Sequence, residues 1–170
     1  MALQKKICML GGFAVGKTSL VGCFVSSMFS DKYQTTVGVK VDKKMVKVND
    51  TEVIMVLWDV QGEDGVQKMQ KTYLRGSAGY VIVVDGTRGP TLDVAEKVQQ
   101  FAQELLGPIP FVVFINKTDL EDQWDLDEEA IRRLAQKGWY LFKTSAKTGV
   151  SVEEGFQTLA RKMLEGDTGA

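Results

Sequence analysis

Several things are scarce in this 170-residue sequence, and each scarcity excludes a class of function. The chain has no histidine, so acid–base catalysis by histidine and zinc sites built on histidine are both excluded. Its formal net charge of −1 provides neither the basic surface that nucleic acid requires nor a polybasic patch for anionic lipid. The only cysteines, Cys8 and Cys23, lie in apolar contexts, so we expect buried, reduced thiols without a disulfide.

Targeting and membrane signals are also missing from the sequence. No apolar run approaches the roughly 20 residues that a membrane-spanning helix needs. The short apolar stretch near the N-terminus runs into glycines and Lys17, which is not typical of a signal peptide. Ala2 excludes myristoylation, and the last residues, EGDTGA, carry no cysteine for prenylation. We therefore expect a soluble cytoplasmic protein without an intrinsic membrane anchor, folded as a single domain over residues 1–170.

What the sequence does contain is an alternation of strand and helix patterns. Residues 6–10, 80–85 and 111–116 are apolar throughout, as are strands buried on both faces of a parallel sheet. Residues 37–48 and 52–58 form the one clear hairpin, with a register change near Lys43 and Lys44 that suggests a bulge. A final strand is expected over residues 139–144.

Helical patterns separate these strands. They cover residues 17–26, residues 91–106 before Gly107, a helix capped by Asp125 with Glu128, and a last helix capped by Ser151 with Glu154. The order predicts an α/β fold of three layers. Its mostly parallel six-stranded sheet should have one antiparallel edge strand.

A phosphate-binding loop is predicted between the first strand and the first helix. Gly11 is followed after four residues by Gly16-Lys17-Thr18, and this strand–loop–helix setting is what such a motif requires. Glycines let backbone N–H groups surround an anion at the helix N-terminus. Lys17 would supply charge to the outer phosphates, and Thr18 would supply a hydroxyl ligand to magnesium. A plain strand–turn–helix corner is the alternative, but it gives Lys17 little structural reason to be there.

The segment NKTD, residues 116–119, predicts which base is bound. It follows an apolar strand, and ligands of open α/β sheets lie at such strand ends. The Asp119 carboxylate can accept hydrogen bonds from the N1–H and the amine of guanine, whereas adenine offers no such donor pair. A simple turn at the strand end is the alternative, which the phosphate loop upstream disfavours. Asp119 likewise disfavours an ATP-dependent kinase with the same loop.

Taken together, the motifs give the chain a strong resemblance to one family. The segments GGFAVGKT, TTVGV, WDVQG, NKTD and TSAK occur in order over residues 5–165, as in small GTPases of the Ras superfamily, and the Rab-like branch is the most similar. The resemblance implies the P-loop NTPase fold of small G proteins. It also implies a switch that cycles between GTP and GDP, with slow, magnesium-dependent hydrolysis of GTP to GDP and phosphate.

The resemblance also implies a role for individual residues. Magnesium would be held by Thr18, by Thr36 in the GTP state, and by Asp59 through a water molecule. Hydrolysis would involve Lys17, Thr36 and Gly62. The residues expected to surround the nucleotide are Phe13, Ala14, Val15, Gly16, Lys17, Thr18, Ser19, Phe29, Tyr33, Thr36, Gly62, Asn116, Lys117, Asp119, Ser145, Ala146 and Lys147.

Two positions depart from the family pattern. Glu63 stands where the family has the glutamine that orients the attacking water, and a carboxylate cannot donate to the phosphoryl oxygens. Gln61, on the other side of Gly62, could reach the water instead. Phe13 stands where many relatives carry a small residue, and its ring would obstruct an arginine supplied by a partner. Both departures predict weak hydrolysis.

Three hypotheses about function therefore remain open at the level of sequence. The first is a GTP/GDP switch whose exchange factor, activating protein and effector bind through residues 30–40 and 59–75. The second is a GTP-bound pseudo-GTPase that acts as a binding scaffold. The third is an excised G domain of a larger multidomain protein.

Overall fold

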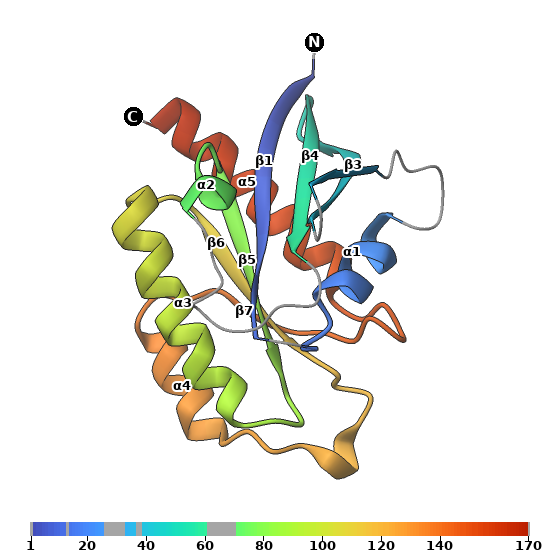
Figure 1. Ribbon diagram of the computed structural model, residues 1–170, viewed down its shortest axis with the longest axis vertical. Helices are drawn as coiled ribbons and strands as arrows, with labels where there is room; N and C mark the ends of the chain where they lie inside the picture. The colour runs from blue at the N-terminus through green and yellow to red at the C-terminus, as the bar shows by residue number, and fades with distance from the viewer. Residues whose placement is uncertain (1, 13, 26–32, 37–38, 61–70, 170) are drawn as a thin grey trace.

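The computed structural model describes residues 2–12, 14–25, 33–36, 39–60 and 71–169. Within these ranges the chain forms one seven-stranded sheet in the order β2-β3-β4-β1-β5-β6-β7 (Figure 1). The strands are β1 (Leu3–Gly11), β2 (Tyr33–Thr36), β3 (Val39–Val48), β4 (Thr51–Val60), β5 (Gly79–Asp85), β6 (Phe111–Asn116) and β7 (Leu141–Lys143). The helices are α1 (Lys17–Val25), α2 (Lys71–Leu74), α3 (Pro90–Leu106), α4 (Glu128–Gln136) and α5 (Val152–Gly169), with a 3-10 turn, η2, at Glu121–Gln123.

The three-layer α/β fold is confirmed. Helices α1 and α5 cover one face of the sheet, and α3 and α4 cover the other (Figure 1). Because alternate side chains of a strand point to opposite faces, the apolar runs of β1, β5 and β6 contribute to both cores. Phe114 of β6 packs against Phe156 of α5 on the first face, and Ile115 joins the cluster of α3 and α4 on the second. No helix of the described residues is long and apolar enough to cross a membrane.

The antiparallel part of the sheet differs from the expectation. β3 pairs antiparallel with β4, as the hairpin pattern predicted, but it does not form the edge because β2 pairs with it on its other side. The sheet therefore has one more strand than the six expected. The bulge predicted near Lys43 and Lys44 is wrong, since β3 and β4 stay in one register from Val39 to Val48. The irregularity lies instead between Gln34 and Thr36, where β2 meets β3.

The predicted cap of α4 is also wrong by two residues. Asp127, not Asp125, is the N-cap, and its side chain accepts a hydrogen bond from the Glu129 N–H. Asp125 instead accepts from the Gly89 N–H at 2.8 Å and so connects this segment to the start of α3. Both carboxylates satisfy a backbone donor near a helix start, and spacing alone did not distinguish the two.

Parallel pairing decides where a binding site can form. β1 pairs in parallel with β4 and β5, and β5 pairs in parallel with β6, so their carboxyl ends meet at one edge of the sheet. Gly11, Asp85 and Asn116 are the last residues of β1, β5 and β6, and Asp85 lies opposite Asn116 in register. The phosphate loop and the NKTD segment, which follow β1 and β6, therefore lie at this edge, which faces the bottom of Figure 1.

Candidate functional site

The loop between β1 and α1 makes a close turn that depends on two glycines. Gly11 has φ 140° and Gly16 has φ 108°, both in the region that favours glycine. A Cβ atom at Gly16 would lie 2.2 Å from the Asn116 amide nitrogen, and one at Gly11 would lie 2.5 Å from the Val83 carbonyl oxygen. A side chain at either position would thus collide with the floor of the site, and this explains the spacing of the motif.

Lys17 begins α1 and turns its ammonium group back toward this loop. Its Nζ donates to the carbonyl oxygens of Gly11, at 3.2 Å, and Gly12, at 3.0 Å. Burial lowers the pKa of Lys17, and the charge of Asp59 opposes that shift. A half-buried ammonium held against backbone carbonyls at a helix N-terminus is placed to contact an anion.

Thr18 of α1 and Asp59 of β4 form a second polar contact, next to the phosphate loop. The Thr18 hydroxyl donates to Oδ2 of Asp59 at 2.5 Å, although the two residues are 41 positions apart. Asp59 is only 1% exposed, and its Oδ1 has no hydrogen-bond partner among the described residues. Burial raises the pKa of Asp59, while Thr18, Lys17 and Lys40 lower it and Asp42 adds to the rise.

These oxygen atoms fit a magnesium ion. A buried carboxylate oxygen without a hydrogen bond calls for a partner, and a hydroxyl beside a carboxylate is a donor set that Mg²⁺ accepts. The described residues contain no group of three or more acidic, cysteine or histidine side chains that could hold a metal. Mg²⁺ usually takes only one or two protein ligands and completes its shell with phosphate and water.

Asn116 connects two loops, the phosphate loop and the TSAK segment. Its amide nitrogen donates to the Val15 carbonyl at 3.1 Å, across 101 positions of sequence. Its amide oxygen accepts from the Thr144 hydroxyl and from the Ala146 N–H, both at 3.2 Å. Since Asn116 is 2% exposed and all of these bonds are internal, it acts as a strut between the phosphate loop and the TSAK segment.

Asp119 is exposed, but its direction is fixed by Ser145. The hydroxyl of Ser145, which is fully buried, donates to Oδ1 of Asp119 at 2.7 Å and accepts from the Thr148 N–H at 3.1 Å. The carboxylate thus stands at the strand ends beside Asn116, where it can accept hydrogen bonds from a ligand.

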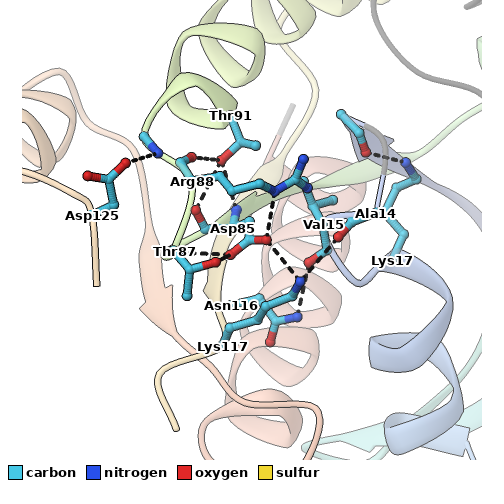
Figure 2. A network of polar contacts seen from close by, with 12 residues as sticks. Ala14, Val15, Lys17, Asp85, Thr87, Arg88, Thr91, Asn116, Lys117 and Asp125 are labelled. Atoms are coloured by element: carbon cyan, nitrogen blue, oxygen red, sulfur yellow. Dashed lines mark hydrogen bonds and ion pairs between the residues drawn. The ribbon is translucent and has the colours of Figure 1, made fainter. Parts of the chain in front are cut away.

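Lys117 connects the phosphate loop to the end of β5. Its Nζ donates to the Ala14 carbonyl at 3.3 Å and lies 2.9 Å from Oδ2 of Asp85 (Figure 2). Asp85 is not among the residues predicted from the sequence. The sequence did offer a signal for Asp85. It is a carboxylate at the end of a buried strand, and the next strand ends at Asn116.

The structure brings most of the predicted site residues together. The phosphate loop, Thr18, Asp59, the NKTD segment and the TSAK segment meet at one sheet edge, and Ser19 and Lys147 are exposed there. Tyr33 and Thr36 belong to β2, of which only the backbone is described. Five predicted residues lie outside the described residues: Phe13, Phe29, Gln61, Gly62 and Glu63.

Such an arrangement can bind a nucleotide together with a divalent ion. A cation and glycine-formed turn at a helix N-terminus accept phosphates, a hydroxyl–carboxylate pair accepts a divalent ion, and a fixed carboxylate accepts paired donors of a base. All three lie within one continuous set of loops.

Comparison with known proteins agrees with this chemistry. The sequence model of the Ras family matches residues 6–165. The chain is 33% identical to Ras-related protein Rab-7a of Dictyostelium discoideum over 183 aligned positions, covering 99% of this chain and 89% of that protein. It is 32% identical to Ras-related protein Rab-7b of Bos taurus, covering 94% of this chain and 82% of that protein.

Proposed function

Because the chain belongs to the Ras family and is a GTP-binding switch with GTPase activity, we propose which of its residues perform each part of that function. The residues of the phosphate loop from Phe13 to Ser19 wrap the phosphates, with Lys17 as the charged contact. Asn116, Lys117 and Asp119 frame the guanine, Ser145, Ala146 and Lys147 complete its pocket, and Phe29 and Tyr33 close over the nucleotide.

A single observation carries this assignment. The Asn116 side chain contacts both the phosphate loop, through Val15, and the TSAK segment, through Ala146. Two segments far apart in the sequence therefore meet at Asn116, so that one ligand could contact both. Asp119, held by Ser145, supplies the choice of guanine over adenine.

We propose Thr18 and Asp59 as the protein's contribution to the magnesium site, joined by Thr36 when GTP is present. The support is the Thr18–Asp59 contact and the buried Oδ1 of Asp59. Bound magnesium would neutralise charge that develops on the phosphates during hydrolysis. Thr18 and Asp59 would fix the ion beside Lys17, and so they make nucleotide release slower when the metal is bound.

Hydrolysis should be slow without a partner. We propose that Lys17 stabilises charge on the outer phosphate oxygens and that the Gly62 N–H donates to the same group. Glu63 cannot donate to those oxygens as a glutamine does, so we propose that it contributes weakly and that Gln61 is the candidate to replace it. The family assignment does not favour the hypothesis of an inactive scaffold.

Partner binding is proposed for the two segments that respond to the nucleotide. We place the effector, exchange-factor and activating-protein contacts at residues 30–40 and 59–75, and we propose a single G domain over residues 1–170. We propose a cytoplasmic location, in which Cys8 and Cys23 would stay reduced. We propose no contact with nucleic acid.

The decisive experiment identifies the ligand before it measures turnover. The nucleotide that co-purifies with the protein is identified, and then GDP and ADP are titrated in the presence of magnesium. We expect guanine nucleotide in the purified protein and at least a thousandfold preference for GDP, since a hydrogen-bonding site rejects a mismatched ligand strongly. Binding of ADP within tenfold of GDP would overturn the assignment.

A further inference from the structure

Asp85 is a buried carboxylate that no step described so far uses. It ends β5, pairs in register with Asn116 of β6, and is 1% exposed. A charge in such a place is costly unless several donors surround it. Its surroundings therefore indicate what the carboxylate is for.

Both oxygens of the Asp85 carboxylate have donors, and these donors come from two separate segments of the chain (Figure 2). Oδ1 accepts from the N–H of Thr87 at 2.8 Å and from its hydroxyl at 2.7 Å. Oδ2 lies 3.0 Å from Nε of Arg88 and 2.9 Å from Nζ of Lys117. Thr87 and Arg88 belong to the adjoining loop, whereas Lys117 belongs to the base segment on another strand.

These contacts keep Asp85 ionised. Burial alone raises the pKa of Asp85, but the hydrogen bonds from Thr87, Lys117 and Arg88 outweigh it and hold the pKa at about 2. The carboxylate is thus negatively charged at neutral pH, and it faces the ammonium of Lys117.

The backbone of Lys117 needs such an anchor. Its φ is 73°, a left-handed conformation that a residue with a side chain adopts at a cost of about 1 kcal/mol or more. Strained residues of this kind persist where the surrounding contacts over-determine them. Here Lys117 is held at its ammonium by Asp85 and by the Ala14 carbonyl of the phosphate loop.

We propose that Asp85 is a positioning residue for guanine-nucleotide binding, which holds the Lys117 side chain between the base segment and the phosphate loop before the nucleotide arrives. This inference rests on the proposed function of the site. The affinity for the nucleotide increases because a long, flexible lysine that is already fixed loses less conformational freedom when the ligand binds. Since GDP and GTP present the same base and ribose, both should benefit equally.

The test measures release of a fluorescent GDP in the presence of magnesium. Asp85→Asn keeps the size of the side chain but removes the charge opposite Lys117, and we expect about tenfold faster release of both GDP and GTP. Arg88→Gln is the matched control, because it removes the other cation on the same oxygen and leaves Lys117 in place. We expect that variant to stay within twofold of the wild type.

A double-mutant cycle separates positioning from general stability. In a Lys117→Ala background, Asp85→Asn should change the release rate less than twofold, since its effect acts through Lys117. An equal acceleration in both backgrounds would overturn the proposal, as would unchanged release in Asp85→Asn alone. If Asp85→Asn does not fold, Thr87→Val can replace it, because it removes the hydroxyl that donates to Oδ1 of Asp85. We expect about threefold faster nucleotide release from Thr87→Val, and no such acceleration in the Lys117→Ala background. An acceleration that persists in the Lys117→Ala background would overturn the proposal.

The wild-type titration keeps this inference separate from the proposed function. If the wild type prefers GDP over ADP and Asp85→Asn releases GDP at the wild-type rate, only the role of Asp85 fails. If the wild type shows no preference for GDP, the proposed function fails first.

Discussion

At the base side of the site, the side chains of Asn116, Lys117 and Asp119 are each hydrogen-bonded to another part of the chain. At the phosphate side, the buried Asp59 has one oxygen bonded to Thr18 and another without a hydrogen bond among the described residues. The protein itself therefore completes the geometry of the base side. The oxygen atoms of Thr18 and Asp59 at the phosphate side fit the magnesium ion that we propose there.

This difference has a consequence for how the two sides respond to change. Substitutions at the base side should alter which base binds, and magnesium should not affect the outcome. Substitutions at the phosphate side should act through magnesium and should distinguish GTP from GDP. Three experiments test this contrast.

The largest effect is expected for Asp119→Asn. An asparagine can still accept the hydrogen bond of Ser145, so the loop should keep its shape. It cannot pair with both donors of guanine, but its amide can donate to the O2 of xanthine. We expect a loss of GDP affinity of about 10⁴-fold and a gain of affinity for xanthosine diphosphate, both measured by titration.

Glu121→Gln is the control for that substitution, because it neutralises an exposed carboxylate of η2 close by in sequence. It should bind GDP as the wild type does. An Asp119→Asn protein that still binds GDP within tenfold of the wild type would show that the base is not selected by this carboxylate.

A smaller effect, on the order of a hundredfold, is expected for Thr18→Asn, as for other changes around bound metals. The substitution replaces the hydroxyl that contacts Asp59, so GTP should weaken more than GDP. Release rates with and without EDTA provide the measurement. EDTA should accelerate release from the wild type and from Asp119→Asn, but it should add little in Thr18→Asn. Wild-type release that is insensitive to EDTA would contradict the magnesium assignment.

The smallest effect concerns hydrolysis, where Phe13 and Glu63 lie outside the described residues. Glu63→Gln alone should raise single-turnover cleavage only modestly. Together with Phe13→Gly it should exceed the combined single effects and reach about tenfold, or ~1.4 kcal/mol of barrier.

The starting rate should be no faster than ~10⁻⁴ s⁻¹, the scale of unaided members of the family. If Gln61 positions the water instead, Gln61→Ala should cut the rate sharply and Glu63→Gln should change little. Wild-type cleavage at ~0.1 s⁻¹ without a partner would refute the expected weakness.

Much of this protein is determined by its sequence alone. The apolar runs over residues 80–85 and 111–116 indicated parallel strands, because only strands covered on both faces can be apolar throughout. The Gly11 and Gly16 spacing indicated the loop, since a side chain at either position would collide with Val83 or Asn116. These features are local, so a short window of sequence contains the physical constraint.

Other features were decided only by the tertiary structure. The cap of α4 moved from Asp125 to Asp127 because Asp125 bonds to Gly89, which lies 36 residues earlier in the chain. β3 is not the edge strand of the sheet, because β2 pairs with it. No window of sequence shows that Asp85 faces Lys117, because that ion pair joins the ends of two adjacent strands and depends on their register. Pairing between distant segments is a property of the assembled sheet, and it alone determined which buried charges meet.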